Sequence, residues 1–64
     1  MKVSDFIKKV NYGSAKLPVY FKEGVSGTER KAISFDFAGY YYDEKERTVT
    51  SISLDVDRIT VYYK

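Results

Sequence analysis

Two short clusters of carboxylates are the residues of this chain whose types and spacing could support chemistry. The acidic positions are Asp43, Glu44 and Glu46 in "DEKE" and Asp55 and Asp57 in "DVD". Paired carboxylates can serve as general acid and base, or they can hold a hard cation. Each cluster lies at a predicted hairpin tip, beside the basic residue Lys45 or Arg58. We therefore interpret both clusters as solvated turns and expect no metal.

The other common catalytic arrangements are excluded by composition. The chain has no cysteine and no histidine, so Ser-His-Asp and Cys-His nucleophiles and the usual zinc, iron and copper ligands cannot occur. It also lacks G-x-G-x-x-G and G-x-x-x-x-G-K-[ST] loops. A chain of 64 residues would have difficulty enclosing a pocket of ~300 Å³ while keeping a core. We predict a protein that is not an enzyme, with no catalytic residue and no cofactor.

Three consecutive tyrosines in "AGYYYDEKERTV" are the second notable feature. If the following hairpin loop has an even count, such as 43–46, Tyr41 joins the apolar face of its strand while Tyr40 and Tyr42 project from the other side. If the loop has five residues, Tyr41 changes face and Gly39 absorbs the extra residue in a bulge. Both alternatives remain open, and each places at least one of the three tyrosines away from the helix.

The elements that must position these side chains begin with a short helix. Its apolar residues recur at i, i+3, i+4 and i+7: Val3, Phe6, Ile7 and Val10. Ser4 can cap this helix and Gly13 can end it, which predicts a helix over 4–11. Lys8 and Lys9 fall on its exposed side, and we interpret them as a solvated face and not as a phosphate site.

After the helix, apolar residues alternate with polar ones, which predicts strands. The expected strands cover 17–22, 33–37, 52–56 and 59–63. "EGVSGTER" between the first two is interpreted as a surface loop, and Pro18 as the start of a strand or an edge position. A turn at Asp57 and Arg58 sets Val56 opposite Ile59.

The predicted fold class is α+β, with one N-terminal helix packed on one face of a mainly antiparallel four-stranded sheet in a single domain, residues 1–64. The alternating pattern also predicts one core cluster, with Phe35 near its centre. Its expected members are Phe6, Ile7, Val10, Val19, Phe21, Ile33, Phe35, Phe37, Ile52, Leu54, Ile59 and Val61.

Net charge and hydropathy indicate where the protein is located in the cell and which classes of partner it can bind. Eleven Lys and Arg against nine Asp and Glu give a net charge of +2, with the two signs interspersed. A dedicated nucleic-acid binder usually shows a stronger and more clustered basic footprint. No apolar run approaches the ~20 residues that span a bilayer. We expect a cytoplasmic protein that does not contact membranes.

A partner-binding surface is predicted on the sheet face away from the helix. Tyrosine is common in protein interfaces because it offers a large contact area at low entropy cost. The candidate binding residues are Tyr20, Tyr40, Tyr42, Tyr62, Arg58 and Lys64. The alternative is a single-stranded nucleic-acid binder that stacks bases on these rings, although Asp36 and Asp55 on the same face would repel phosphate.

A homodimer is also expected, formed by edge pairing of the terminal strand "TVYYK".

In layout, the chain resembles the short accessory proteins of bacteriophages and mobile elements. The resemblance rests on the opening "MKVSDFIKKV", the "LPVYFKEG" strand and the closing "ISLDVDRITVYY" hairpin. Such proteins are often small, free of cysteine and non-enzymatic, and some occlude a host defence protein such as a CRISPR nuclease. The resemblance implies an interaction or inhibitor protein and assigns no individual residue a role.

Overall fold

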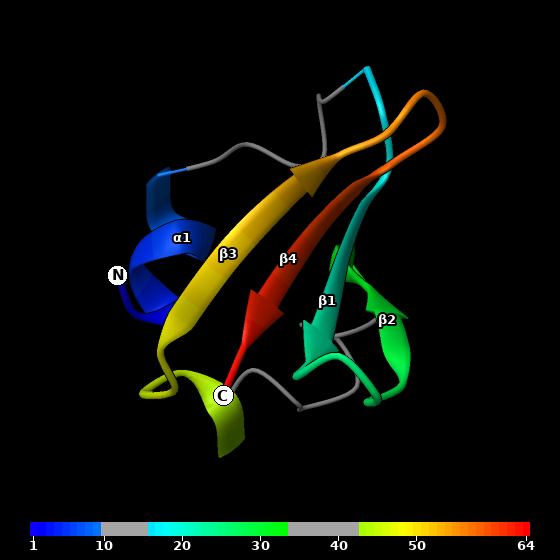
Figure 1. Cartoon of the computed structure of the whole chain (residues 1–64). Helices are drawn as coiled ribbons and strands as arrows, with labels where there is room; N and C mark the ends of the chain where they lie inside the picture. Colours follow the sequence, from blue (N-terminus) through cyan, green and yellow to red (C-terminus); the bar gives the residue numbers. More distant parts are fainter. Residues whose placement is uncertain (10–15, 34–42) are drawn as a thin grey trace.

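The computed structural model describes residues 1–9, 16–33 and 43–64, and in this part of the chain four strands form one sheet (Figure 1). The elements are α1 (Val3–Lys9), β1 (Val19–Glu23), β2 (Glu29–Lys31), β3 (Val49–Leu54) and β4 (Ile59–Tyr63). The order of the strands across the sheet is β2-β1-β4-β3. The fold is therefore α+β.

The sheet is mixed, whereas the sequence predicted a mainly antiparallel one. β1 pairs with β2 and β3 with β4 in antiparallel fashion, but β1 and β4 run parallel, with Val19 beside Ile59 and Phe21 beside Val61. The parallel pair lies in the middle of the sheet. β4 is consequently a central strand, so the expected pairing of "TVYYK" with a second copy is wrong: both of its edges are already occupied.

β2 overlaps the end of the segment that was interpreted as a loop: Glu29 and Arg30 belong to that segment and Lys31 follows it. Its residues, Glu29 to Lys31, are all charged and show no apolar alternation, so only backbone pairing with β1 makes them a strand. Of the predicted strand at 33–37 only Ile33 is described, and there the prediction is wrong, because Ile33 is exposed and lies in a helical turn that follows β2. The two alternatives for Tyr40 to Tyr42 and Gly39 also lie outside them.

The β3–β4 hairpin forms with a register that differs from the expected one by two residues. Leu54 lies opposite Ile59, and the backbone N–H of Asp55 donates to the carbonyl oxygen of Arg58 over 2.9 Å, so the turn residues are Val56 and Asp57. Because side chains alternate with a period of two, this shift leaves every side chain on its expected face. β3 also begins earlier than predicted and contains a bulge between Val49 and Ser51.

α1 begins at Val3, one residue before the predicted cap Ser4. The first helical N–H groups are satisfied by another part of the chain: Val3 donates to the carbonyl oxygen of Arg47 over 2.9 Å and Ser4 to that of Lys45 over 3.0 Å. A helix of 7 residues is marginal alone, and this backbone cap fixes its start. The predicted last residues of the helix, 10 and 11, lie outside the described part.

The buried cluster joins the helix to the two central strands. Its members are Val3, Phe6, Val19, Phe21, Ala32, Val61 and Tyr63. Phe21 lies between two edge-to-face ring contacts, with centroids 5.6 Å from Phe6 and 6.4 Å from Tyr63. Ring pairs of this geometry add to the stabilisation that burial gives.

The predicted core is correct on β1 and β4 and wrong on β3. Ile7 and Ile59 pack against the cluster as expected, but Ile33, Ile52 and Leu54 are exposed. The alternation did place Ile52 and Leu54 on the same face as Val61; that face is left uncovered towards the hairpin tip. The remaining predicted members, Val10, Phe35 and Phe37, lie outside the described residues.

Candidate protein-binding surface

The sheet face opposite the buried cluster, called here the outer face, carries two parallel rows of side chains. Strand register places Lys31, Tyr20, Thr60 and Ser53 side by side in one row and Glu29, Lys22, Tyr62 and Ser51 in the next. Each row thus contains a lysine, a tyrosine and a serine. Thr60, between Tyr20 and Ser53, is only 2% exposed, so the first row is closely packed.

Tyr20 is covered on one side by a fixed cation. The guanidinium carbon of Arg58 lies 4.5 Å from the ring centroid of Tyr20, and an Arg58 N–H donates to Oε2 of Glu29 over 2.7 Å. The carboxylate holds the guanidinium over the ring, and the ring quadrupole attracts the cation. Tyr20 and Arg58 therefore form a pre-ordered unit, in which the guanidinium covers one face of the Tyr20 ring.

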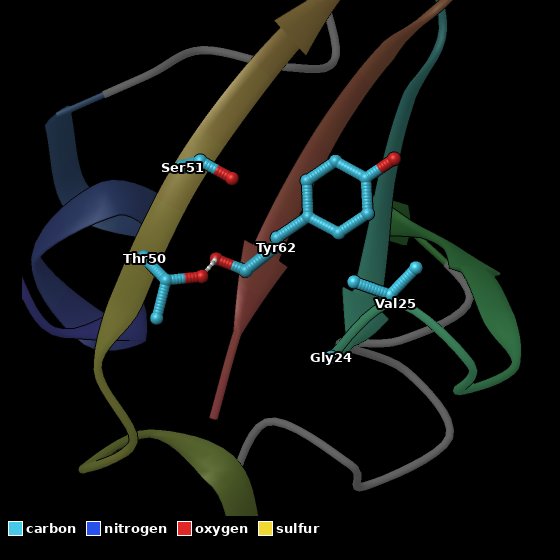
Figure 2. A pocket seen from close by; sticks show the side chains of 5 residues that line it. All are labelled: Gly24, Val25, Thr50, Ser51 and Tyr62. Carbon is cyan, nitrogen blue, oxygen red and sulfur yellow. Dashed lines mark hydrogen bonds between the residues drawn. The ribbon is translucent and has the colours of Figure 1, made fainter.

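Tyr62 forms the wall of an open hollow in the outer face. The hollow has a volume of about 170 Å³ and is lined by Gly24, Val25, Thr50, Ser51 and Tyr62. Figure 2 shows the ring of Tyr62 extending across β1 with Val25 beside it, and Thr50 and Ser51 on the β3 side. The Thr50 hydroxyl donates to the carbonyl oxygen of Tyr62 over 3.3 Å. The bulge in β3 places Thr50 there, because it inserts one extra residue into the pairing.

The β1–β2 turn holds Val25 at the rim of this hollow. Gly24 has φ of 63°, a conformation that suits glycine, and its N–H donates to the carbonyl oxygen of Tyr63 over 2.8 Å. Gly27 lies so close to the carbonyl oxygen of Glu23 that a β-carbon would overlap it. Val25 is left 86% exposed, an apolar side chain held out by a tight turn.

Two carboxylates of the first acidic cluster, Glu44 and Glu46, bind cations of the chain itself. Arg47 donates to Glu44 over 2.9 Å and also to Glu23, and the hydrogen bond to Glu23 is the main cause that raises the pKa of Arg47. Lys2 donates to Glu46 over 2.7 Å, and this contact lowers the pKa of the Glu46 carboxyl and raises that of Lys2. These side chains tie the 44–47 turn to β1 and to the chain start.

The predicted site residues are brought together in part. Tyr20, Tyr62 and Arg58 share the outer face, and Lys64 is exposed at the end of β4, with its backbone paired to Thr48. Tyr40 and Tyr42 lie outside the described residues.

Sequence reasoning missed the other residues of the hollow. Val25 could have been found, since two strands joined by a short glycine-containing loop are typical of a hairpin. Nothing in the sequence indicates the bulge that brings Thr50 to the hollow.

Two further observations bear on the kind of site. No group of three or more Asp, Glu, His or Cys side chains within residues 1–9, 16–33 and 43–64 is placed to hold a metal ion. None of the helices in the described ranges has the length and apolarity needed to cross a bilayer. Comparison with known proteins gave no matching family model, no matching curated protein and no matching solved structure.

Proposed function

We propose that this chain is a non-enzymatic, cytoplasmic protein-binding module whose working surface is the outer face, centred on the Tyr62 hollow. In this proposal α1 covers the buried face and leaves the outer face for a partner. The observation that carries it is an open hollow walled by a tyrosine and an exposed valine, beside the ordered Tyr20–Arg58 unit. Inhibition of a host protein by occlusion, which the resemblance to phage accessory proteins implies, fits this mode of action.

The size of the hollow favours a side chain of a partner over a free small molecule. Ligand pockets usually measure ~300–1,000 Å³, whereas a cavity of ~150 Å³ accommodates a single benzene ring. At about 170 Å³ the hollow can take one apolar or aromatic side chain. Its surroundings, Lys22 and Lys31 with the Arg58–Glu29 pair, suit a partner that presents acidic groups around such an anchor.

Truncation of Tyr62 tests the proposal. With a partner captured from the native host, Tyr62→Ala should weaken binding by roughly 2 kcal/mol, about thirtyfold in Kd, as expected for a central interface tyrosine. Circular dichroism should show an intact fold, because Tyr62 is not in the buried cluster. The matched control reverses charge on the helix, Lys8→Glu with Lys9→Glu, and should change Kd little. Loss of binding in the control but not in Tyr62→Ala would move the surface to α1.

A second candidate is single-stranded nucleic-acid binding, and one observation favours it. The register places Lys22 beside Tyr62 and Lys31 beside Tyr20, so each ring has a cation next to it, as stacking platforms require. The two candidates differ in salt dependence. Phosphate contacts lose affinity steeply as salt rises, whereas an aromatic protein interface is much less sensitive. A fluorescence anisotropy titration with a labelled oligonucleotide between 50 and 200 mM salt, roughly the range over which such contacts weaken, separates them.

A further inference from the structure

Among the described strands β3 is an outer one, and described residues occupy its far edge only at its start. There the N–H of Val49 donates to the carbonyl oxygen of Met1 over 2.7 Å, and Lys2 forms an isolated bridge with Thr48. Beyond this point no described residue pairs with the edge of β3 that faces away from β4. The open edge runs from Thr50 to Val56 at the hairpin turn.

The hydrogen-bonding groups along this edge belong to Ile52 and Leu54. Residues of an antiparallel ladder alternate between hydrogen-bonded and non-hydrogen-bonded pairs. The bond from Asp55 to Arg58 fixes that pair as hydrogen-bonded, so Ile52 and Leu54 form the non-bonded pairs with β4. Their N–H and C=O groups therefore point out of the sheet.

Of the features that keep edge strands apart, the open stretch has one charged residue, Asp55, and the bulge of β3 at its start. β3 contains no charged residue and no proline. Ile52 is 49% exposed and Leu54 75%, and both lie on one face, while Val56 in the turn is 99% exposed. An open row of backbone groups flanked by exposed apolar side chains is suited to pair with another strand.

We propose that two copies of this chain join through β3, antiparallel about a two-fold axis at Ser53, to make one continuous eight-stranded sheet. Ser53 is the middle residue of the open stretch from Thr50 to Val56, so pairing about Ser53 uses the whole stretch. In this register Ile52 of one copy exchanges both backbone hydrogen bonds with Leu54 of the other, and apolar side chains lie opposite each other.

Neighbouring registers are less favourable. A shift that centres the axis on Ile52 extends the pairing to Thr48 and collides with the Met1–Lys2 segment. A shift that centres it on Leu54 shortens the pairing. In the proposed register the turn of one copy, with Asp57, comes to the end of β3 where Lys2 of the other copy is paired with Glu46.

The pairing would add a residue to the candidate surface. Opposite Ser51, which lines the hollow, lies Asp55 of the second copy, and the two side chains share the outer face. The dimer would then present two hollows on one face, each with an acidic group at its rim. This last point rests on the proposed function; the dimer itself does not.

A single introduced cysteine tests the register, because the natural chain has none. At the two-fold axis Ser53 and its copy form a non-hydrogen-bonded pair with Cα atoms about 4.5 Å apart, within the range that a disulfide spans. Ser53→Cys should convert to a disulfide-linked dimer under mild oxidation. The matched control is Ser51→Cys, on the same strand and face, whose two copies would lie roughly 14 Å apart and should not link.

Association in solution is measured in parallel. Light scattering at about 100 µM should give twice the monomer mass for the wild-type chain, and Ile52→Lys should shift the dissociation constant at least tenfold, because edge lysines oppose strand pairing. A wild-type monomer at this concentration, or equal cross-linking of both cysteine variants, would overturn the proposal. Partner binding that still depends on Tyr62 in such a monomer would leave the proposed function standing.

Discussion

At the scale of single residues, Tyr63 shows how this small core accommodates a polar group. Its side chain is fully buried, and an Arg30 N–H donates to the phenol oxygen over 3.0 Å. The guanidinium carbon of Arg47 lies 5.7 Å from the centre of the same ring. Burial is the main cause that raises the pKa of Tyr63 above its ordinary value of 10.0, since the charged phenolate loses solvation.

This shift predicts a loss of stability in alkali. Above pH 10 the unfolded chain releases the Tyr63 proton while the folded chain retains it, so the free energy of unfolding falls as pH rises towards the folded pKa. Tyr63→Phe cannot ionise and should show a flatter decline in urea melts between pH 9 and 11, a window around the ordinary pKa of tyrosine, roughly 10. At pH 7 the same variant should be less stable by about 1–2 kcal/mol, because it loses the bond from Arg30. Identical slopes for both proteins above pH 10 would contradict the role given to Tyr63.

At the scale of elements, local alternation predicts which way side chains point but not which strands are neighbours. Val19, Phe21 and Val61 were placed inward correctly because the pattern lies within each strand. On β3 and β4 the predicted register was wrong by two residues, but the predicted face of each side chain stayed correct because two is one full period of alternation. β2 was missed because its residues, Glu29 to Lys31, are charged, and its pairing depends on the backbone and the turn before it.

That turn provides a prediction for the β1–β2 hairpin. Gly27→Ala should lower the free energy of unfolding by about 1–3 kcal/mol, the usual cost of overpacking, because a β-carbon would overlap the carbonyl oxygen of Glu23. Val25→Ala, in the same turn, is the matched control and should stay within about 0.5 kcal/mol, because Val25 is exposed. Chemical denaturation measures both. Equal stabilities would mean that the turn relaxes freely and does not hold Val25 at the hollow.

At the scale of the whole molecule, the arrangement that the sequence could not reveal is the parallel pairing of β1 with β4. It joins residues about forty positions apart, with Val19 beside Ile59. The alternation of apolar and polar residues within one strand cannot predict such a distant contact. This pairing also shapes the candidate surface, because the adjacency of β1 and β4 brings Tyr20 and Tyr62 into neighbouring rows of the outer face. It also places β4 inside the described sheet and makes β3 one of its two outer strands.

The centre of the core follows from this arrangement and can be tested against the sequence-based expectation. Phe21, on a central strand between the rings of Phe6 and Tyr63, is fully buried, whereas Leu54 was predicted to be core and is exposed. Phe21→Ala should cost about 3–5 kcal/mol. At ~0.05–0.15 kcal/mol per residue, a chain of this length has about 3–10 kcal/mol in total, so this variant should be largely unfolded. Leu54→Ala, measured at low micromolar concentration so that association does not contribute, should melt within a few degrees of wild type. Thermal melts by circular dichroism in which Leu54→Ala was less stable than Phe21→Ala would place the core on β3. The assignment of the outer face as the exposed face of the sheet would then be wrong.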